Sequence, residues 1–271
     1  MKKILLPLGI LPLLLCSCNG GIQDSETTYK ITFFNVGKAD AILLQYNDTN
    51  MVIDTGTKDS EEYFLEGLKR LNVDKIDCLI ITHFDQDHVG GAASLISSYE
   101  IDTVYQTYEG KTSKEYARYK MALAEQNITP TTVLEDLSFT LGEVAYTIYP
   151  AYSDTYSNSE SNNSSLCIRS VYKNTSYLFA GDAEKERIKE LNKLNIESDF
   201  LKVPHHGGIE DNSQKFFTKV NPKYAVITDS IDEPADSKVL GLLEYVGCKV
   251  YSTKNGDITL RSDGNAIEIK Q

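Results

Sequence analysis

The sequence lacks the residues that would support a disulfide-held scaffold or a strongly basic surface. It has only 5 cysteines in 271 residues, and a chain of this length can bury a full core without covalent staples. Cys78, Cys167 and Cys248 each lie in or beside an apolar run, so we expect small buried thiols there. The formal net charge of −12 excludes a diffuse electrostatic grip on a long polyanion, which needs an excess of lysine and arginine.

Long apolar runs are also scarce, and the longest stands at the N-terminus. Two lysines precede residues 4–15, which are too few to span a bilayer and which contain Pro7 and Pro12. The letters "LCSC" that follow resemble the end of a bacterial lipoprotein signal. This resemblance implies cleavage before Cys18 and lipid on its sulfur, which would anchor the protein to a membrane of the bacterial cell envelope, outside the cytoplasm. An ordinary cleaved signal with incidental cysteines is the alternative.

The chain is expected to consist of a signal peptide, a short tether and one domain. Residues 1–17 are the expected lipoprotein signal peptide, and the polar residues 18–28 are a short tether. No further linker or internal repeat interrupts residues 29–271. Apolar runs that favour strands alternate there with segments of helical spacing, and two segments are typical of hairpins. This mixture predicts a layered α/β fold.

The expected elements follow from these patterns. Strands are predicted at residues 30–37, 41–46, 50–56, 78–82, near 103, 199–206, 224–229 and 248–253. Hairpins are predicted at residues 137–151 and 165–182 and at the C-terminus, and helices at residues 59–71, 92–98 and 113–126. Residues 152–165, rich in serine, asparagine and tyrosine, are predicted to form a loop.

All 4 histidines lie in two short clusters at the ends of apolar runs. The first cluster is "ITHFDQDHVGG" and the second is "LKVPHHGG". Four apolar runs end in ionisable residues, namely Asp54; His83, Asp85, Asp87 and His88; Asp182; and His205 with His206. Because sites in layered α/β folds gather at strand ends, we expect these side chains to converge.

Converging carboxylates and imidazoles indicate a metal centre. Without cations among them, the buried negative charges would repel one another. This donor set suits zinc, manganese or iron, since no cysteine is placed to ligate. Asp87 and His88 are adjacent and point to different sides, which favours two ions rather than one. An aspartate such as Asp182 can bridge two ions, and two ions together activate a shared water as a hydroxide nucleophile.

The first histidine cluster also resembles a known signature. "THFDQDHVGG" is similar to the HxHxDH motif of the metallo-β-lactamase fold, with Asp85 in the place of the second histidine. This variant is typical of the soluble domain of ComEC-type competence proteins, which take part in DNA uptake. "FFNVGKADAILLQ", "MVIDTG", "NNSSLCI", "LFAGDAEKE" and "LKVPHHGG" resemble further segments of that branch in the same order. The resemblance implies a four-layer αββα sandwich for nearly all of residues 29–271.

The resemblance implies roles for the site residues as well. The metal ligands would be His83 and Asp85 on one ion; Asp87, His88 and His205 on the other; and Asp182 as the bridge. Asp87 would also be catalytic, and Asp40 and Asp54 would orient the ligand histidines. His206 would be a catalytic acid or a substrate contact, or would only pack beside His205, and these two histidines could exchange roles.

The chain departs from the branch at several positions. Asn163 is not such a departure: it falls where many members of the fold have a further metal-binding histidine, but an asparagine is usual there within the branch. Gly208 replaces the usual serine after the paired histidines. A late His-Pro of the branch is missing, and Asp236 is the nearest polar residue. Loss of that imidazole would affect rate and specificity more than metal binding.

We therefore expect an extracytoplasmic hydrolase with two divalent metal ions, zinc or manganese, and a metal-bound hydroxide that attacks phosphodiesters. The acidic charge favours nucleotides or short strands over a long nucleic-acid groove. One alternative is a non-catalytic metal-binding or scaffold lipoprotein, which the missing His-Pro favours slightly. Another is a hydrolase of β-lactams or thioesters.

Overall fold

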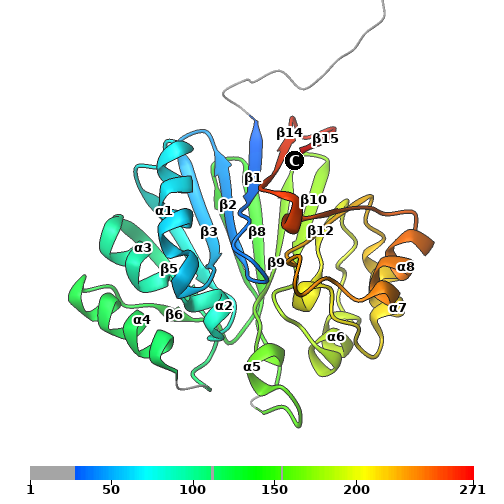
Figure 1. Ribbon diagram of the computed structural model, residues 1–271, viewed down its shortest axis with the longest axis horizontal. Helices are drawn as coiled ribbons and strands as arrows, with labels where there is room; N and C mark the ends of the chain where they lie inside the picture. Colours follow the sequence, from blue (N-terminus) through cyan, green and yellow to red (C-terminus); the bar gives the residue numbers. More distant parts are fainter. Residues whose placement is uncertain (1–27, 111–112, 154) are drawn as a thin grey trace, which may run out of the picture.

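Two β-sheets lie face to face in the computed structural model, and helices cover their outer faces (Figure 1). The structure describes residues 28–110, 113–153 and 155–271. The predicted signal peptide, the lipidation site Cys18 and all but the last residue of the tether lie outside these residues. Among the described helices, none is long and apolar enough to cross a membrane.

The first sheet has the strand order β15-β14-β1-β2-β3-β4-β5-β6. Its strands are β1 (Tyr29–Phe33), β2 (Ala41–Tyr46), β3 (Thr49–Thr55), β4 (Ile76–Ile81), β5 (Ile101–Gln106), β6 (Thr131–Thr132), β14 (Ile258–Ser262) and β15 (Ile267–Lys270). The helices α1 (Glu61–Arg70), α3 (Ala92–Ser98) and α4 (Lys114–Glu125) pack on its outer face (Figure 1). Strands β3, β4 and β5 pair in parallel, so their carboxyl ends meet at one edge.

The second sheet has the strand order β13-β12-β11-β10-β9-β8-β7. Its strands are β7 (Leu137–Leu141), β8 (Val144–Tyr149), β9 (Cys167–Tyr172), β10 (Thr175–Phe179), β11 (Phe200–Lys202), β12 (Tyr224–Ile227) and β13 (Lys249–Ser252). The helices α6 (Lys185–Leu191), α7 (Ser213–Val220) and α8 (Ser237–Tyr245) cover its outer face. Strands β10 to β13 are parallel, and their carboxyl ends meet as those of β3 to β5 do.

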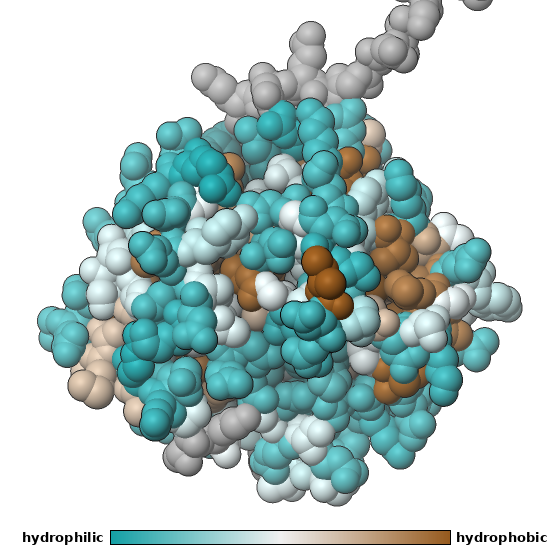
Figure 2. Space-filling view, in the orientation of Figure 1, coloured by the Kyte–Doolittle hydropathy of each residue, from teal (hydrophilic) through white to brown (hydrophobic). Residues whose placement is uncertain are grey.

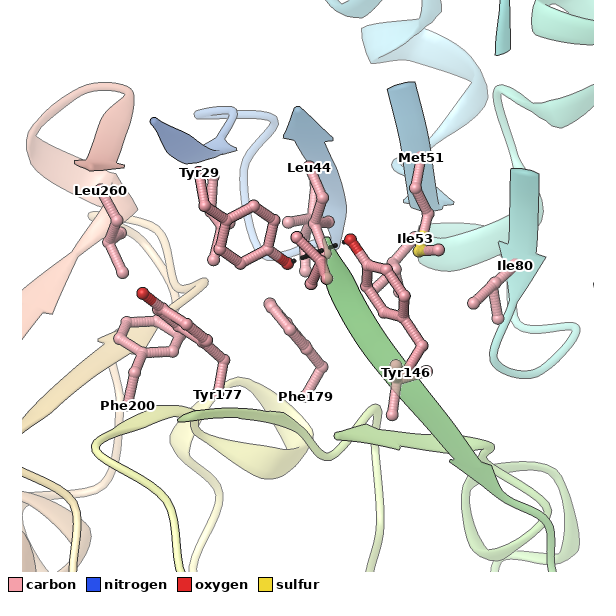
Figure 3. Close-up of a cluster of buried hydrophobic side chains, with 14 of the residues drawn as sticks. Tyr29, Leu44, Met51, Ile53, Ile80, Tyr146, Tyr177, Phe179, Phe200 and Leu260 are labelled. Carbon is pink, nitrogen blue, oxygen red and sulfur yellow. Dashed lines mark hydrogen bonds between the residues drawn. The ribbon is translucent and has the colours of Figure 1, made fainter. Parts of the chain in front are cut away.

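Aromatic side chains fill the space between the sheets (Figure 3). The Phe33 ring lies 5.6 Å from that of Phe200 and 6.3 Å from that of Phe179, measured between centroids. Tyr146 donates a 3.4 Å hydrogen bond to the hydroxyl of Tyr29, so the polar ends of these buried rings have partners. Together with the two helix–sheet cores this makes three apolar interfaces, and the predicted four-layer αββα sandwich is confirmed.

The element boundaries differ from the predicted ones near the strand ends that carry the predicted metal ligands. The strand predicted at 199–206 ends at Lys202, and the 3-10 turn Pro204–Gly207 follows. His205 and His206 both have a φ of 50°, which lies in the left-handed region and outside the extended conformation of a regular strand. The strand predicted at 30–37 ends at Phe33, and a four-residue helix, α5 (Glu160–Asn163), lies within the predicted loop 152–165.

Candidate metal centre

The carboxyl ends of β3, β4, β10 and β11 bring the predicted site residues to one edge of the sandwich. The short helix α2 (Gln86–Val89) lies at this edge, with α5 below it in Figure 1. Four side chains offer ligand atoms within 4.8 Å of one another, and they are Asp87, His88, Asp182 and His206. The structure therefore brings these four side chains together, three of which the sequence predicted as metal ligands.

Gly90 and Gly91, which follow α2, allow this segment to pack closely against the backbone near the end of β3. A Cβ atom on Gly90 would lie 2.3 Å from the carbonyl oxygen of Gln86 and 2.5 Å from the backbone nitrogen of Lys58. Gly91 is similarly confined, since its Cβ would lie 2.5 Å from the carbonyl oxygen of Thr55. Any side chain at Gly90 or Gly91 would push the histidine segment away from the end of β3.

Asp54 fixes the orientation of His88. Its Oδ1 accepts the N–H of Thr82 at 2.8 Å, and its Oδ2 accepts the Thr82 hydroxyl at 2.6 Å. The same Oδ2 lies 2.8 Å from Nδ1 of His88, so this nitrogen donates and carries the proton. Nε2 of His88 is thereby the nitrogen that faces the centre, buried and without a hydrogen-bond partner. The predicted orienting role of Asp54 has a direct structural basis.

A similar contact orients His206. Its Nδ1 lies 2.9 Å from the carbonyl oxygen of Thr228, which can only accept, so Nδ1 donates. The Thr228 hydroxyl in turn donates to Oδ1 of Asp40 at 2.6 Å. Nε2 of His206 faces the centre, 3.1 Å from Oδ2 of Asp182 and 3.3 Å from Oδ2 of Asp87.

His83 lies beside His88 with a ring-centroid separation of 4.1 Å. Its Nδ1 is 3.1 Å from the hydroxyl of Thr82 and 3.3 Å from that of Ser165. Because the Thr82 hydroxyl already donates to Asp54, it accepts from His83, and Nε2 of His83 is again unpartnered. Burial, followed by the neighbouring His88, lowers the pKa of His83 to about 4, so the ring is in the neutral form that binds metals.

The carboxylates of the centre are held in the ionised form. Burial raises the pKa of Asp182, but the charges of His206 and His88 outweigh it and hold the pKa well below its usual range. The pKa of Asp87 is also lowered, because His88 and His206 outweigh its burial. Conversely, Asp182 outweighs burial at His206 and raises the pKa of that ring to about 9. The carboxylates thus require positive charge beside them, which protons on the imidazoles supply when no metal is bound.

The predicted ligand Asp85 and the polar residues Asn163 and Asp236 lie outside this group of four. Asp85 is half-buried at the start of α2 and its carboxylate accepts the hydroxyl of Ser161. Asn163 donates to the carbonyl oxygen of Asn158 and accepts the N–H of Arg187, so its amide is engaged with the backbone. Asp236 accepts the N–H of Lys238 and begins α8, which is a capping role.

His205 does not join the other predicted ligands. Its Nδ1 lies 3.5 Å from Glu184 and 3.6 Å from Glu210, and its side chain is 29% exposed. The two left-handed residues of the turn separate the adjacent rings, whose centroids are 6.4 Å apart. His206 instead faces Asp87 and Asp182, so the geometry favours the exchange of the two histidines that the sequence left open.

Sequence analysis missed Lys202, which is fully buried beneath the centre. Its ammonium contacts Asp40, lies 3.6 Å from Oδ1 of Asp182 and donates to the carbonyl oxygen of Gly181 at 3.1 Å. Burial lowers the pKa of Lys202, but Asp40 and Asp182 outweigh burial and raise the pKa, so the group is charged. The available signal was a lone lysine inside the apolar run "FLKVP".

The side chains of the centre fit a metal site. Nε2 of His83, His88 and His206 are all buried without a hydrogen-bond partner. Buried polar atoms are normally paired, so several buried ligand atoms without partners indicate that a further group binds between them. Imidazole nitrogens and carboxylate oxygens are the donors that zinc, manganese and iron accept.

Comparison with known proteins agrees with this geometry. A family model described as the metallo-beta-lactamase superfamily matches residues 35–228. The chain is 28% identical over 214 residues to ComE operon protein 3 of Bacillus subtilis, across 74% of this chain and 26% of that protein. It is 24% identical over 267 residues to Recombination protein 2 of Haemophilus influenzae, across 92% of this chain and 31% of that protein. The chain thus spans less than a third of the length of either relative.

A solved structure shows the same fold at low identity. The metallo-beta-lactamase fold protein YhfI from Bacillus subtilis superposes with a TM-score of 0.60 and 10% identity, covering 86% of this chain and 100% of that one. The aligned family model, the αββα layers and the histidine–aspartate cluster at the strand ends lead to one assignment. The chain belongs to the metallo-beta-lactamase superfamily.

Proposed function

We propose that this protein is an extracytoplasmic phosphodiesterase that works with two divalent metal ions, zinc or manganese. The observation that carries the proposal is the convergence of two buried, unpartnered imidazole nitrogens, Nε2 of His88 and Nε2 of His206, on the carboxylate of Asp182. A group of this composition has little structural purpose without cations, because each unpaired buried atom lowers stability.

The ligands divide into two sets around a shared aspartate. In this proposal the first ion is held by His83 and Asp85, the second by Asp87, His88 and His206, and both by Asp182. Two divalent ions at this position supply an activated water and neutralise the charge of a bound phosphate. The assignment of His206 rather than His205 rests on the 3.1 Å and 3.3 Å distances from its Nε2 to Asp182 and Asp87.

Two partly exposed side chains act on the reactants. The carboxylate of Asp87, 28% exposed at the side-chain level, accepts a hydrogen bond from the attacking water and orients it. His205, with similar exposure, stands at the rim and contacts the leaving group. Glu184 and Glu210 both lie near Nδ1 of His205, at 3.5 Å and 3.6 Å. His206, predicted as a catalytic acid, is too deeply buried for that contact.

The substrate class follows from charge and from the relatives. The names of the relatives refer to a ComE operon and to recombination, and these names support a nucleic-acid-derived substrate. The formal net charge of −12 opposes a long polyanion along the surface, so nucleotides or short strands are favoured. The face shown in Figure 2 is mostly hydrophilic, and its apolar residues gather mainly on the side of α7 and α8.

A direct assay tests this function. The protein lacking residues 1–17 is loaded with manganese or zinc, its metal content is measured, and bis(p-nitrophenyl) phosphate and short oligonucleotides are offered. We expect two ions per chain and phosphodiester turnover that Asp87→Asn abolishes. Turnover of a β-lactam or a thioester instead would assign another hydrolase class. Absence of phosphodiester turnover in the fully loaded protein would reject the proposal and favour a scaffold role.

We also propose that the mature protein is anchored through lipid on Cys18. The charged and apolar N-terminal segment and the following "LCSC" support this location. An anchor of this kind would place the metal centre at a membrane surface of the cell envelope, with no transmembrane helix required.

A further inference from the structure

Lys202 is the one lysine among the described residues that is fully buried. It is the last residue of β11, and the apolar residues Leu201 and Val203 on either side are also fully buried. An isolated buried ammonium is strongly unfavourable unless it is paired and hydrogen-bonded. A hydrophobic residue would satisfy the packing at this position, so the lysine needs an electrostatic explanation.

The ammonium of Lys202 is held at three oxygen atoms. It forms an ion pair with Oδ2 of Asp40, donates to the carbonyl oxygen of Gly181 at 3.1 Å, and lies 3.6 Å from Oδ1 of Asp182. Asp40 is itself fixed, because its Oδ1 accepts the hydroxyl of Thr228 at 2.6 Å. The lysine therefore presents a charge of fixed position to one oxygen of Asp182.

The two oxygens of Asp182 face different partners. Oδ1 faces the ammonium of Lys202, whereas Oδ2 lies 3.3 Å from Nε2 of His88 and 3.1 Å from Nε2 of His206. The backbone N–H of Asp182 is tied to the hydroxyl of Ser165 at 3.1 Å, which limits movement of the residue as a whole. The carboxylate is thus oriented before any cation binds.

We propose that Lys202 is a positioning residue that holds Oδ1 of Asp182, so that Oδ2 is the oxygen that the carboxylate would offer to the metal centre. This inference rests on the dinuclear centre of the proposed function. A cation at Oδ1 would stand beside the lysine ammonium and be repelled by it, whereas Oδ2 faces unpartnered nitrogens only. Without the lysine, the carboxylate is free to give one oxygen to each ion.

A simpler role for Lys202 is to neutralise the buried Asp40 and so stabilise the fold. The two roles can be separated when Asp40 is replaced by an uncharged residue, because only a positioning role requires Lys202 to go on orienting Asp182. Asp40→Asn removes the negative charge that a purely structural lysine would neutralise, but it keeps the contact between Lys202 and Asp182. Asp40→Asn combined with Lys202→Met removes one negative and one positive charge, so the net charge of the site is that of the wild type.

The experiment compares the wild type, Asp40→Asn and the Asp40→Asn/Lys202→Met double variant in the chain lacking residues 1–17. Chelator competition measures the affinity for each of two manganese ions, and electron paramagnetic resonance measures the magnetic coupling within the pair. Thermal melts of the metal-free variants establish that each is folded. Lys223→Met, which removes a largely exposed lysine paired with Asp199 at 2.8 Å, is the matched control.

We expect the double variant to bind one of its ions about 10–100-fold more weakly than Asp40→Asn does, the usual effect of losing a partner that orients a ligand. Its manganese pair should also show a changed magnetic coupling, which a role in stability alone would not alter. Equal affinities and equal coupling in Asp40→Asn and the double variant would overturn the inference. If the double variant does not fold, two single variants, Lys202→Arg and Lys202→Met, are each compared with the wild type. Retained magnetic coupling in Lys202→Arg supports the inference, and unchanged coupling in a folded Lys202→Met overturns it.

Failure of this inference is distinguishable from failure of the proposed function. Two ions in the wild type with no effect of the lysine would reject the role of Lys202 alone. Two ions with normal coupling but no phosphodiester turnover would reject the proposed activity alone. Uptake of a single ion by the wild type would reject both.

Discussion

Replacing Asp54 by asparagine tests how firmly the protein orients His88. The carboxylate of Asp54 accepts the N–H and the hydroxyl of Thr82 and the Nδ1–H of His88, at 2.8, 2.6 and 2.8 Å. An asparagine has a single acceptor oxygen, and its amino group would face a donor. Either the backbone N–H of Thr82 loses its acceptor, or the proton of His88 moves to Nε2 and blocks the lone pair that faces the centre.

The structure sets the size of the expected effect. Losing a hydrogen bond to a charged group costs about 1.5–3 kcal/mol. Since about 1.4 kcal/mol corresponds to a tenfold change in an equilibrium constant, we expect metal affinity to fall about 10–100-fold, the range observed for partners of metal-binding histidines. The backbone adds little to this cost, because Asp54 has a φ of 55° and asparagine tolerates that region well.

Chelator competition with the metal-free protein measures this affinity. Asp77→Asn is a matched control, because Asp77 accepts the backbone N–H of Asn50 at 2.8 Å at the opposite end of β4. Thermal melts of both metal-free variants separate a loss of folding from a loss of affinity. Wild-type affinity in Asp54→Asn would refute the reasoning, as would an equal loss in Asp77→Asn.

The remaining predictions concern the same centre and the anchor. Asp182→Ala is expected to lose both ions, because Asp182 is a ligand of each ion in the proposed centre; two ions found by metal analysis would contradict a shared role. His206→Ala is expected to lose an ion, whereas His205→Ala keeps both and slows turnover about 100-fold as a general acid; the opposite pattern would restore His205 as the ligand. In the metal-free protein the pKa of His206 is raised, so its protonated ring stabilises the fold below about pH 6.5. This stabilisation is lost as the pH rises through about 9. Thermal melts in the presence of chelator across that pH range measure the loss. Cys18→Ser is expected to release the protein from membranes, and a variant that resists carbonate washing would exclude this lipid anchor.

Much of the fold was predictable because burial leaves a local signature. The strand β4 is a continuous apolar run, as expected for a strand covered on both faces, and its position was predicted within two residues at each end. Hairpins were also recognisable, since β9 and β10 pair antiparallel within the hairpin predicted at residues 165–182. The order of the strands across the two sheets is not local, because it brings β14 beside β1 at the opposite end of the chain.

The centre was predictable in its location and only partly in its membership. Residues that follow parallel strands must meet at one edge, which is why Asp54, His88 and Asp182 converge. The choice between His205 and His206 depends on a turn in which both residues adopt a positive φ. Sequence patterns favour a simple extended strand there, and only contacts with Thr228 and Asp40 select the observed turn.

The sequence alone determined which segments are buried and which ionisable residues end them, because apolar periodicity and strand-end positions are properties of neighbouring residues. The tertiary structure alone decided which polar atoms share the enclosed space of the centre. Lys202 shows the difference, because its burial is tolerable only beside Asp40 and Asp182, which other strands bring to it. Asp40 and Thr228 lie 188 positions apart, yet they form one hydrogen bond behind His206. Such pairings depend on the long-range register of both sheets, which local sequence does not encode.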